Sequence, residues 1–446
     1  MSNPAGSAAA RLSYPIPTAW FAAAVAVPGL GLLAWPGRSW SVMLVVESLL
    51  AALFVTDAVR CTSPHRIAVT RDAPDSVTVG EPAVIVWTVE NRTDRVSRVV
   101  MADALWPSLH ADRRRVELNM APRARARVRT LLQPARRGRF PLDEVTVRTT
   151  GPMRLVCRQA ARSVPGSMRV MPAYPSRDEV RRRLHAPRVL EGLGSRRSVG
   201  VGTEFDQLRD FNPDDEFRNI DWASTMRFQR PIVKQYRTER NQNVVVLLDN
   251  GRVMAGTVGG VARVEHGMDA VLAVTQAACT VGDRVGLVTF DRQVRSIVVS
   301  SSSRRQLDRM AEAMFMLEPD LTESAYTAAF SAAAARFTRR ALYIVITDLV
   351  EATVDEVLVP ALPILTRRHL VVVGGVQDPA VAEWAGGPTT NAMHRWPSEA
   401  FRQAAAVAAQ SRRERAVARL SSAGAVVVDA APGRLGIELV DTYLRL

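Results

Sequence analysis

The sequence predicts a multi-domain protein with an N-terminal transmembrane helical hairpin, an all-β sandwich domain and a C-terminal α/β domain with a mostly parallel sheet. Two apolar runs of near-membrane length lie close together at the N-terminus. Short segments of alternating apolar and polar residues follow over residues 65–172. Continuous apolar strands then alternate with helical patterns over residues 243–446, which is typical of a sheet covered on both faces.

Length and charge limit the possible functions. A chain of 446 residues is too long for one ordinary core, so two or three domains are expected. The net charge of +14 is compatible with anionic partners such as nucleic acid or acidic lipid head groups. However, Lys234 is the only lysine, and an arginine bias of this kind is typical of a GC-rich genome. We therefore expect no nucleic-acid partner, and the absence of a Gly-x-x-x-x-Gly-Lys motif excludes a P-loop ATPase.

The cysteines indicate neither disulfides nor zinc. Cys61, Cys157 and Cys279 are odd in number, far apart and without Cys-x-x-Cys spacing. We expect three free thiols in a reducing compartment.

The first elements predicted are two membrane-spanning helices. After an N-terminal tail (1–17), the runs Thr18–Trp35 and Trp40–Val55 are each near the roughly 20 residues that cross a bilayer. Their short connection predicts a helical hairpin over 18–56. A cleaved signal peptide would have one apolar core, so two adjacent runs favour a retained hairpin.

The flanking arginines predict the orientation of this hairpin. Several lie outside it, and only Arg38 lies in its turn; those outside are Arg11, Arg60, Arg66 and Arg71. Because positive residues stay inside, we expect a protein of the cytoplasmic membrane with its other domains facing the cytoplasm. Glu47 lies within the second run, where a carboxylate is either functional or simply protonated or hydrogen-bonded.

A β-sandwich is predicted over 65–172, followed by a linker over 177–203. Segments such as Ala83–Asn91 and Glu144–Thr150 alternate with period two and are separated by glycine, proline and asparagine. The glycines near residue 200 lack the strand and helix that a phosphate-binding loop requires, so they indicate flexible chain.

Residues 204–242 form a densely charged segment. Asn212 and Pro213 are followed by three acidic residues, which is a sequence typical of a helix start. The charges either form ion pairs that hold this segment to the next domain or present a recognition surface for another protein. The candidate partner-binding residues are Arg209, Asp215, Arg218, Asp221, Trp222 and Lys234.

The last 204 residues, 243–446, read as an α/β domain. The strand Val244–Leu248 ends at Asp249, and a second strand ends at Asp348. Ligands of open α/β sheets bind beyond the carboxyl ends of the strands, so this edge is the candidate site. A hairpin through Asp291 and Arg292 predicts one antiparallel edge strand.

The whole layout resembles a bacterial family of proteins with a domain of unknown function, number fifty-eight. Twelve residues carry the resemblance: Glu204, Leu208, Arg209, Pro213, Asp215, Arg218, Ile220, Asp221, Trp222, Arg230, Lys234 and Glu239. The resemblance implies a C-terminal domain like that of von Willebrand factor A. It also implies a partner, because members of this family often accompany AAA+ ATPases of the MoxR type.

By the same resemblance, an A domain binds Mg²⁺ through Asp-x-Ser-x-Ser, a hydroxyl from a second loop and an aspartate from a third. Here the first loop is Asp249-Asn250-Gly251-Arg252-Val253, so both serines are missing. Asp348 matches the third loop, and Ser324 or Thr322 could supply the hydroxyl. Too few oxygen ligands remain for a hard cation, so we expect a degenerate site (Asp249, Ser324, Asp348) with no Mg²⁺ and no other cofactor.

No enzyme motif is present. The chain has neither His-Glu-x-x-His nor Gly-x-Ser-x-Gly. His266, Asp283 and Asp291 lie in one region of the sequence, although triad geometry cannot be read from sequence. We expect a membrane-anchored, non-catalytic adaptor or scaffold that acts with a MoxR-type ATPase in protein or complex maturation. The alternatives are a membrane-associated hydrolase and a protein that binds anionic surfaces.

Overall fold

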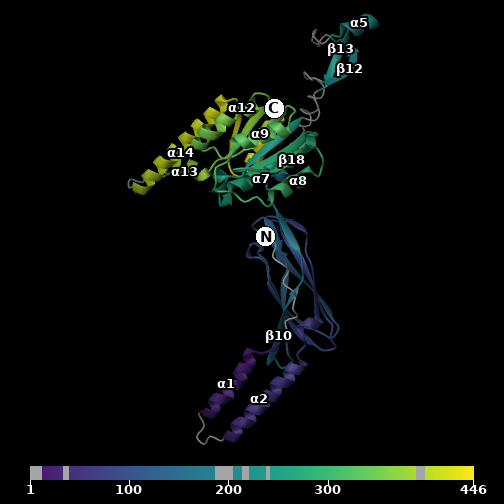
Figure 1. Ribbon diagram of the computed structural model, residues 1–446, viewed down its shortest axis with the longest axis vertical. Coiled ribbons are helices and arrows are strands. Elements are labelled where there is room, and N and C mark those ends of the chain that lie inside the picture. The colour runs from purple at the N-terminus through teal and green to yellow at the C-terminus, as the bar shows by residue number, and fades with distance from the viewer. Residues whose placement is uncertain (1–12, 34–39, 186–203, 213–219, 238–241, 388–396) are drawn as a thin grey trace. The chain divides into compact units, whose positions relative to one another are not determined.

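The computed structural model describes residues 13–33, 40–185, 204–212, 220–237, 242–387 and 397–446. The chain divides into two compact units, Met1–Met171 and Pro172–Leu446. We call them the β unit and the α/β unit (Figure 1).

The β unit consists mostly of antiparallel strands in two layers. One layer is a five-stranded sheet of order β1-β10-β9-β5-β6, and the other contains the sheets β2-β4-β7 and β3-β11-β8. The strands are β1 (Pro15–Pro17), β2 (Ile67–Asp72), β3 (Ser76–Thr78), β4 (Ala83–Asn91), β5 (Ser97–Asp103), β6 (Arg115–Met120), β7 (Arg125–Leu132), β8 (Gly138–Pro141), β9 (Glu144–Thr150), β10 (Val156–Ser163) and β11 (Ser167–Met171). Short 3₁₀ turns, η1 (Pro64–Arg66) and η2 (Pro107–Leu109), complete this part.

One hydrophobic core lies between these layers. Along β4 every second residue is buried, from Ala83 to Asn91, because successive side chains of a strand point to opposite faces. Trp87 on β4 and Met101 on β5 belong to the same core cluster although their strands are in different sheets. The β-rich architecture predicted for residues 65–172 is therefore confirmed.

The predicted transmembrane hairpin is wrong. None of the helices in the described residues combines the length and the apolar character needed to cross a bilayer. Helix α1 (Ala19–Leu33) has 15 residues, which at 1.5 Å per residue is shorter than a bilayer core. Helix α2 (Trp40–Arg60) has 21 residues but contains Glu47 and Asp57. The predicted localisation in the cytoplasmic membrane, by two spans, is wrong for the same reason.

The end of α2 belongs to the β unit. Asp57 is fully buried, and its carboxylate accepts hydrogen bonds from the backbone N–H groups of Met153, Leu155 and Val156 at 2.8–2.9 Å. These bonds hold the helix against the start of β10. The end of α2, just after the apolar run Trp40–Val55, is thus attached to the sandwich.

The α/β unit contains a six-stranded sheet of order β18-β17-β14-β19-β20-β21. Its strands are β14 (Asn243–Asp249), β17 (Arg284–Phe290), β18 (Val294–Ser301), β19 (Ala341–Ile346), β20 (Leu370–Val376) and β21 (Val426–Ala430). All neighbours are parallel except β18, which pairs antiparallel with β17 at the edge. The mostly parallel sheet with one antiparallel edge strand is as the sequence predicted.

Helices cover both faces of this sheet (Figure 1). One face packs on α3 (Arg177–Leu184), α7 (Arg263–Val281), α8 (Gln306–Met314) and α15 (Leu435–Arg445). The other packs on α9 (Tyr326–Arg336), the π-helix η4 (Val354–Leu358), α11 (Val359–Ala361), α12 (Pro363–Thr366) and α14 (Pro397–Ser422). Smaller elements are α6 (Arg252–Ala255), β15 (Thr257–Val258), β16 (Val261–Ala262), α10 (Glu351–Thr353) and α13 (Pro379–Gly386).

The sequence of β14 explains the two cores. Val244, Val246 and Leu248 belong to one core cluster, and Val245 and Leu247 belong to the other. A strand buried on both faces must be apolar at every position, and each such side chain contributes about 1.5–3 kcal/mol when fully buried.

Two segments before β14 differ from expectation. Helix α3 lies within the predicted linker 177–203, and its Val180 and Leu184 are buried in a core of the α/β unit. The charged segment contains an antiparallel pair, β12 (Glu204–Asp210) and β13 (Ile232–Arg237), with helix α5 (Trp222–Phe228) between them. We call β12, α5 and β13 the motif hairpin.

Candidate functional site

The carboxyl edge of the α/β sheet brings together the acids predicted from the strand ends. Strand β14 lies between β17 and β19, so the chain first moves to one side of β14 and later returns to the other. Such a reversal of strand order is where open α/β sheets form their crevice. Asp249 ends β14, Asp291 follows β17 and Asp348 follows β19.

Asp249 is fully buried, and its carboxylate is saturated with hydrogen bonds. One oxygen accepts from the backbone N–H of Gly251 at 2.8 Å and from the Ser324 hydroxyl. The other accepts from the Tyr326 hydroxyl at 2.6 Å and the Thr347 hydroxyl at 2.7 Å. Burial raises the pKa of Asp249, and these hydrogen bonds oppose that rise. The same burial, with Asp249 alongside, raises the pKa of Tyr326.

Gly251 makes this arrangement possible. A Cβ atom on Gly251 would lie 2.0 Å from the Ser324 hydroxyl oxygen. The Ser324 hydroxyl therefore occupies space that a serine at position 251 would need. Of the two candidates for the second-loop hydroxyl, Ser324 contacts Asp249. Thr322 instead uses its backbone, accepting a bond from the N–H of Arg252 and donating one to Asp320.

Asp348 is paired with two arginines. One oxygen accepts a hydrogen bond from Arg413 at 2.9 Å, and the other lies 3.2 Å from Nε of Arg263. Arg413 also donates two bonds to Asp429, at 2.7 and 2.8 Å. Burial alone lowers the pKa of Arg413, but the hydrogen bonds to Asp429 and the charge of Asp348 together raise it.

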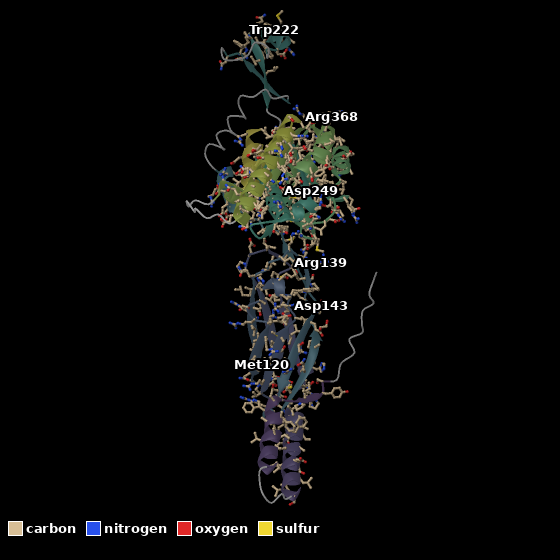
Figure 2. All side chains as sticks on the ribbon, turned by 90° about the vertical axis from the view of Figure 1, so that its left-hand side faces the viewer. Met120, Arg139, Asp143, Trp222, Asp249 and Arg368 are labelled. Carbon is tan, nitrogen blue, oxygen red and sulfur yellow. The ribbon has the colours of Figure 1, made fainter. Side chains whose placement is uncertain are left out.

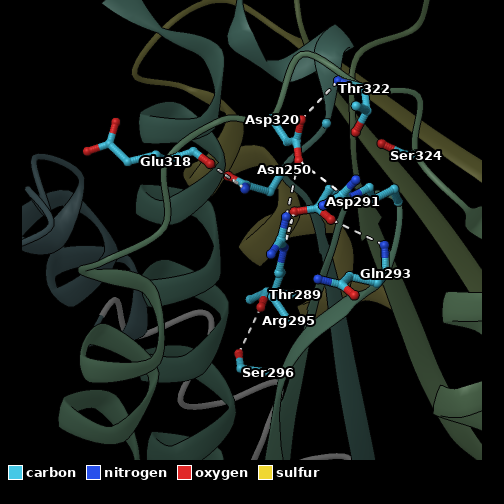
Figure 3. Close-up of polar contacts among 12 residues, drawn as sticks. Asn250, Thr289, Asp291, Gln293, Arg295, Ser296, Glu318, Asp320, Thr322 and Ser324 are labelled. Carbon is cyan, nitrogen blue, oxygen red and sulfur yellow. Dashed lines mark hydrogen bonds and ion pairs between the residues drawn. The ribbon is translucent and has the colours of Figure 1, made fainter. Parts of the chain in front are cut away.

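Asp291 belongs to a third polar group, shown in Figure 3. Its carboxylate accepts a bond from Nε of Arg295, and Arg295 also donates to Asp320 at 3.1 Å. Asn250 donates to the backbone carbonyl of Glu318 at 2.7 Å. Each of the three strand-end carboxylates is thus neutralised or hydrogen-bonded by side chains of this chain.

These residues do not fit the Mg²⁺ site that the resemblance implies. An octahedral cation needs several oxygen ligands with free lone pairs, but Asp249 already accepts four bonds and Asp348 faces two guanidinium groups. Among the described residues, no group of three or more His, Cys, Asp and Glu side chains could hold a metal. That the protein binds no Mg²⁺ stays a prediction.

Sequence reasoning missed four of the residues that close this edge. Thr347 directly precedes Asp348, and Tyr326 begins α9 two residues after Ser324, so both stood next to residues that were identified. No local sequence pattern pointed to Arg263 and Arg413, because they reach the edge from the start of α7 and the middle of α14, far along the chain from the strand ends.

The partner-binding candidates lie in or beside the motif hairpin. Asp221 caps α5, accepting a bond from the backbone N–H of Ala223 at 3.1 Å, rather than lying within the helix. Arg209 and Lys234 are on β12 and β13. Asp215, Arg218 and the predicted helix start after Pro213 lie outside the described residues.

Helix α5 exposes large apolar side chains. The exposed fractions are 67% for Trp222, 81% for Met226 and 55% for Phe228, and no residue of the helix is buried. Trp222 is labelled in Figure 2. Leu208 on β12 is 40% exposed as well. Trp222 and Met226 are four residues apart and therefore share one face of the helix, and large exposed apolar side chains are typical of surfaces that bind other proteins.

The three residues considered for a catalytic triad are not assembled. Asp283 and Asp291 lie at opposite ends of β17. A strand of 7 residues separates them by about 3.3 Å per residue, which is too far for one site. Asp283 accepts a bond from the Tyr443 hydroxyl at 2.6 Å, and Nε2 of His266 lies 3.4 Å from the carbonyl of Val258.

Comparison with known proteins identifies one family. The model of the family described as "Protein of unknown function DUF58" matches residues 207–390. The family expected from the motif is therefore confirmed. No curated protein matches the chain.

Solved structures give only distant likenesses. The conserved hypothetical protein BatB from Bacteroides thetaiotaomicron is 17% identical with a TM-score of 0.29, over 46% of this chain and 99% of that one. The CARDB domain of PF1109 from Pyrococcus furiosus is 12% identical with a TM-score of 0.15, over 23% and 91%. Proximal thread matrix protein 1 from the mussel byssus is 10% identical with a TM-score of 0.25, over 46% and 45%. Scores this low carry no argument about fold or function.

Proposed function

The chain belongs to the DUF58 family, and we propose that it is a non-catalytic adaptor that binds a partner protein through the motif hairpin. The exposure of the large apolar side chains of α5, which are Trp222, Met226 and Phe228, is the observation that carries this proposal. Side chains of this kind supply most of the affinity in protein interfaces, because their burial on binding removes a large apolar area from water.

The carboxyl edge of the sheet supports a non-catalytic role. A catalytic or metal-binding carboxylate needs free lone pairs that face solvent or substrate. Asp249 is instead fully buried, and Asp348 is held by Arg263 and Arg413. The von Willebrand factor A-like domain implied by the family would then contribute a rigid support rather than a metal-dependent contact.

The family resemblance suggests the partner, an AAA+ ATPase of the MoxR type. Such an ATPase would remodel a client protein, and this chain would bring the two together in protein or complex maturation. The motif hairpin is suited to docking because its apolar side chains are exposed in the unit that contains them.

The test is a binding measurement between the purified full chain and the ATPase. We expect Met226→Glu to weaken binding by tenfold or more, because a charge would be buried at the centre of the contact. Trp222→Ala should weaken it to a similar extent. Surface plasmon resonance with the immobilised full chain gives both affinities.

The matched control is Met153→Glu, which places the same charge at a 41% exposed methionine of the β unit. Its affinity should equal that of the unaltered chain. Both variants should also keep the unaltered circular dichroism spectrum. Folded Met226→Glu and Trp222→Ala variants that bind the ATPase with unchanged affinity would remove the basis of the proposal.

A further inference from the structure

The two edges of the α/β sheet differ in charge. Acids gather at the carboxyl edge, whereas the amino edge carries arginines at the start of, or immediately before, three of the parallel strands. Arg284 begins β17, Arg339 and Arg340 precede β19, and Arg367 and Arg368 precede β20. Figure 2 shows Arg368 at the outside of the unit. Burial, followed by the charges of Arg368 and Arg340, lowers the pKa of His369 at the same edge.

A hollow of about 270 Å³ opens at this amino edge. Arg284, Arg336 and Arg339 line it together with Asn243, Ser300 and Thr338. In the part of the chain that the structure describes, its lining includes no aspartate and no glutamate. Three positive charges therefore surround a small concave surface without a carboxylate to balance them.

The donors of these arginines are largely unused. Arg284 donates one hydrogen bond, to the carbonyl of Ser300 at 3.1 Å. Arg336 and Arg339 make no hydrogen bond or ion pair with any residue in the described ranges. The Ser300 hydroxyl, on a residue that is only 7% exposed, is buried without a hydrogen-bond partner among the described residues.

Several other arginines of the unit are paired with acids. Arg413 is paired with Asp348 and Asp429, Arg252 with Glu323, and Arg415 with Glu351. Arg336 is the last residue of α9, and the negative end of the helix dipole would explain a cation at that position. It does not explain Arg284 and Arg339, which come from other elements.

We propose that this hollow is a binding site for a compact phosphate-bearing anion. A guanidinium group donates two parallel N–H bonds to two oxygens of a phosphate, and three such groups match the charge of a pyrophosphate or diphosphate group. The volume accommodates a diphosphate and part of the molecule that carries it. Asn243 and Thr338 add uncharged polar groups at the rim, where they can contact that carrier.

The site is separate from the motif hairpin and from the carboxyl edge. Its residues come from the starts of β14 and β17, the end of β18 and the segment between α9 and β19. Anion binding there would be independent of the apolar contact through α5, so the two proposals can fail separately.

Titration calorimetry of the full chain at constant ionic strength tests the proposal. The probes are inorganic phosphate, pyrophosphate and adenosine diphosphate. We expect saturable one-site binding of pyrophosphate, and binding of adenosine diphosphate with equal or higher affinity would identify a nucleotide as the carrier. Arg336→Gln and Arg339→Gln should each weaken binding about tenfold or more, because each removes charge-assisted hydrogen bonds.

Arg252→Gln is the matched control, because it removes the same charge from an exposed position at the other edge of the sheet. It should bind pyrophosphate like the unaltered chain. Equal loss in Arg252→Gln would show a general charge effect and overturn the proposal. Absence of saturable binding to all three probes, or unchanged affinity in the Arg336 and Arg339 variants, would overturn it as well.

Discussion

At the scale of single residues, the Ser324 hydroxyl occupies the space beside Asp249 that a serine at position 251 would need. The Ser324 hydroxyl bonds Asp249 in space that opens because residue 251 is a glycine. The φ angle of Gly251 is −85°, which any residue adopts, so the glycine is required for space rather than for backbone freedom. A single side chain thus decides how the strand-end carboxylate is satisfied.

This contact predicts a specific pair of effects. Gly251→Ser should lower the free energy of unfolding by about 1–3 kcal/mol, because its Cβ atom would overlap the Ser324 hydroxyl. Adding Ser324→Ala should recover most of that loss, since the overlapping atom is removed. Urea unfolding of the two single variants and the double variant measures the coupling. Strictly additive effects would show that the two residues do not compete for one space.

In the β unit, Asp103 predicts a pH dependence. Burial raises the pKa of Asp103 to about 6, and Arg71, 4.0 Å away, opposes the rise. The folded state therefore holds this proton more tightly than the unfolded state. The resulting stabilisation is fully present below the unfolded pKa of about 4 and is lost as the pH rises through about 6.

The comparison variant is Asp103→Asn, which cannot titrate. Between pH 4 and pH 7 the unfolding free energy of the unaltered chain should fall relative to that of the variant. Hydrogen exchange of the amides in β4 and β5, corrected for intrinsic rates, reports on this unit alone. Parallel profiles for the two proteins would contradict the assignment.

At the scale of elements, Arg413 ties four of them together at the carboxyl edge. It projects from α14 and bonds Asp348 after β19, the carbonyl of Val376 in β20, and Asp429 in β21. The side chains of Asp348 and Asp429 are only 6% and 12% exposed, so neither carboxylate is well solvated without this partner. The position of α14 over the sheet therefore depends on a buried charge network as well as on apolar packing.

Arg413→Met should consequently lower the free energy of unfolding by about 3–5 kcal/mol, because it leaves buried carboxylates without their main partner. Arg415→Met is the control from the same helix. Arg415 is 57% exposed and pairs with Glu351 at the surface, so its loss should lower the free energy of unfolding much less than the loss of Arg413. Guanidinium chloride is unsuitable because it screens charge, so urea should be used. Equal losses in the two variants would show that the buried network adds no more than a surface pair.

At the scale of the whole molecule, the residues that form the cores are different from the residues that we propose to bind partners. Each unit has its own apolar core, and the α/β unit has one core on each face of its sheet. The exposed apolar helix α5 and the arginine-lined hollow are both outside these cores. The two proposed contacts therefore use surface residues that can be altered without removing core side chains.

The net charge of +14 does not say which arginines pair with acids, and the structure does. Arg263, Arg295 and Arg413 at the carboxyl edge of the sheet are paired with acids, whereas Arg336 and Arg339 at the amino edge have no partner among the described residues. An arginine bias in the genome accounts for the number of arginines. It does not account for their unequal pairing at the two edges.

The sequence alone predicted the elements whose patterns are local. The strands Ala83–Asn91 and Glu144–Thr150 have the predicted bounds, and β14 extends the predicted Val244–Leu248 by one residue at each end. Period-two alternation and continuous apolar runs are sufficient for this, because burial on one or both faces of a sheet imposes them directly. The strand-end acids Asp249 and Asp348 were identified from the same apolar runs, whereas the family motif was identified by resemblance.

Tertiary structure decided what local pattern could not. The apolar run Trp40–Val55 resembled a membrane span, and no pattern in it showed that Asp57, two residues later, is buried and attaches the helix to β10. Arg413 reaches Asp348 from 65 residues away, and no periodicity predicts such a contact. Hydrophobic patterns record how much of a segment is buried, whereas the partners of a buried charge depend on which distant segments the fold brings beside it.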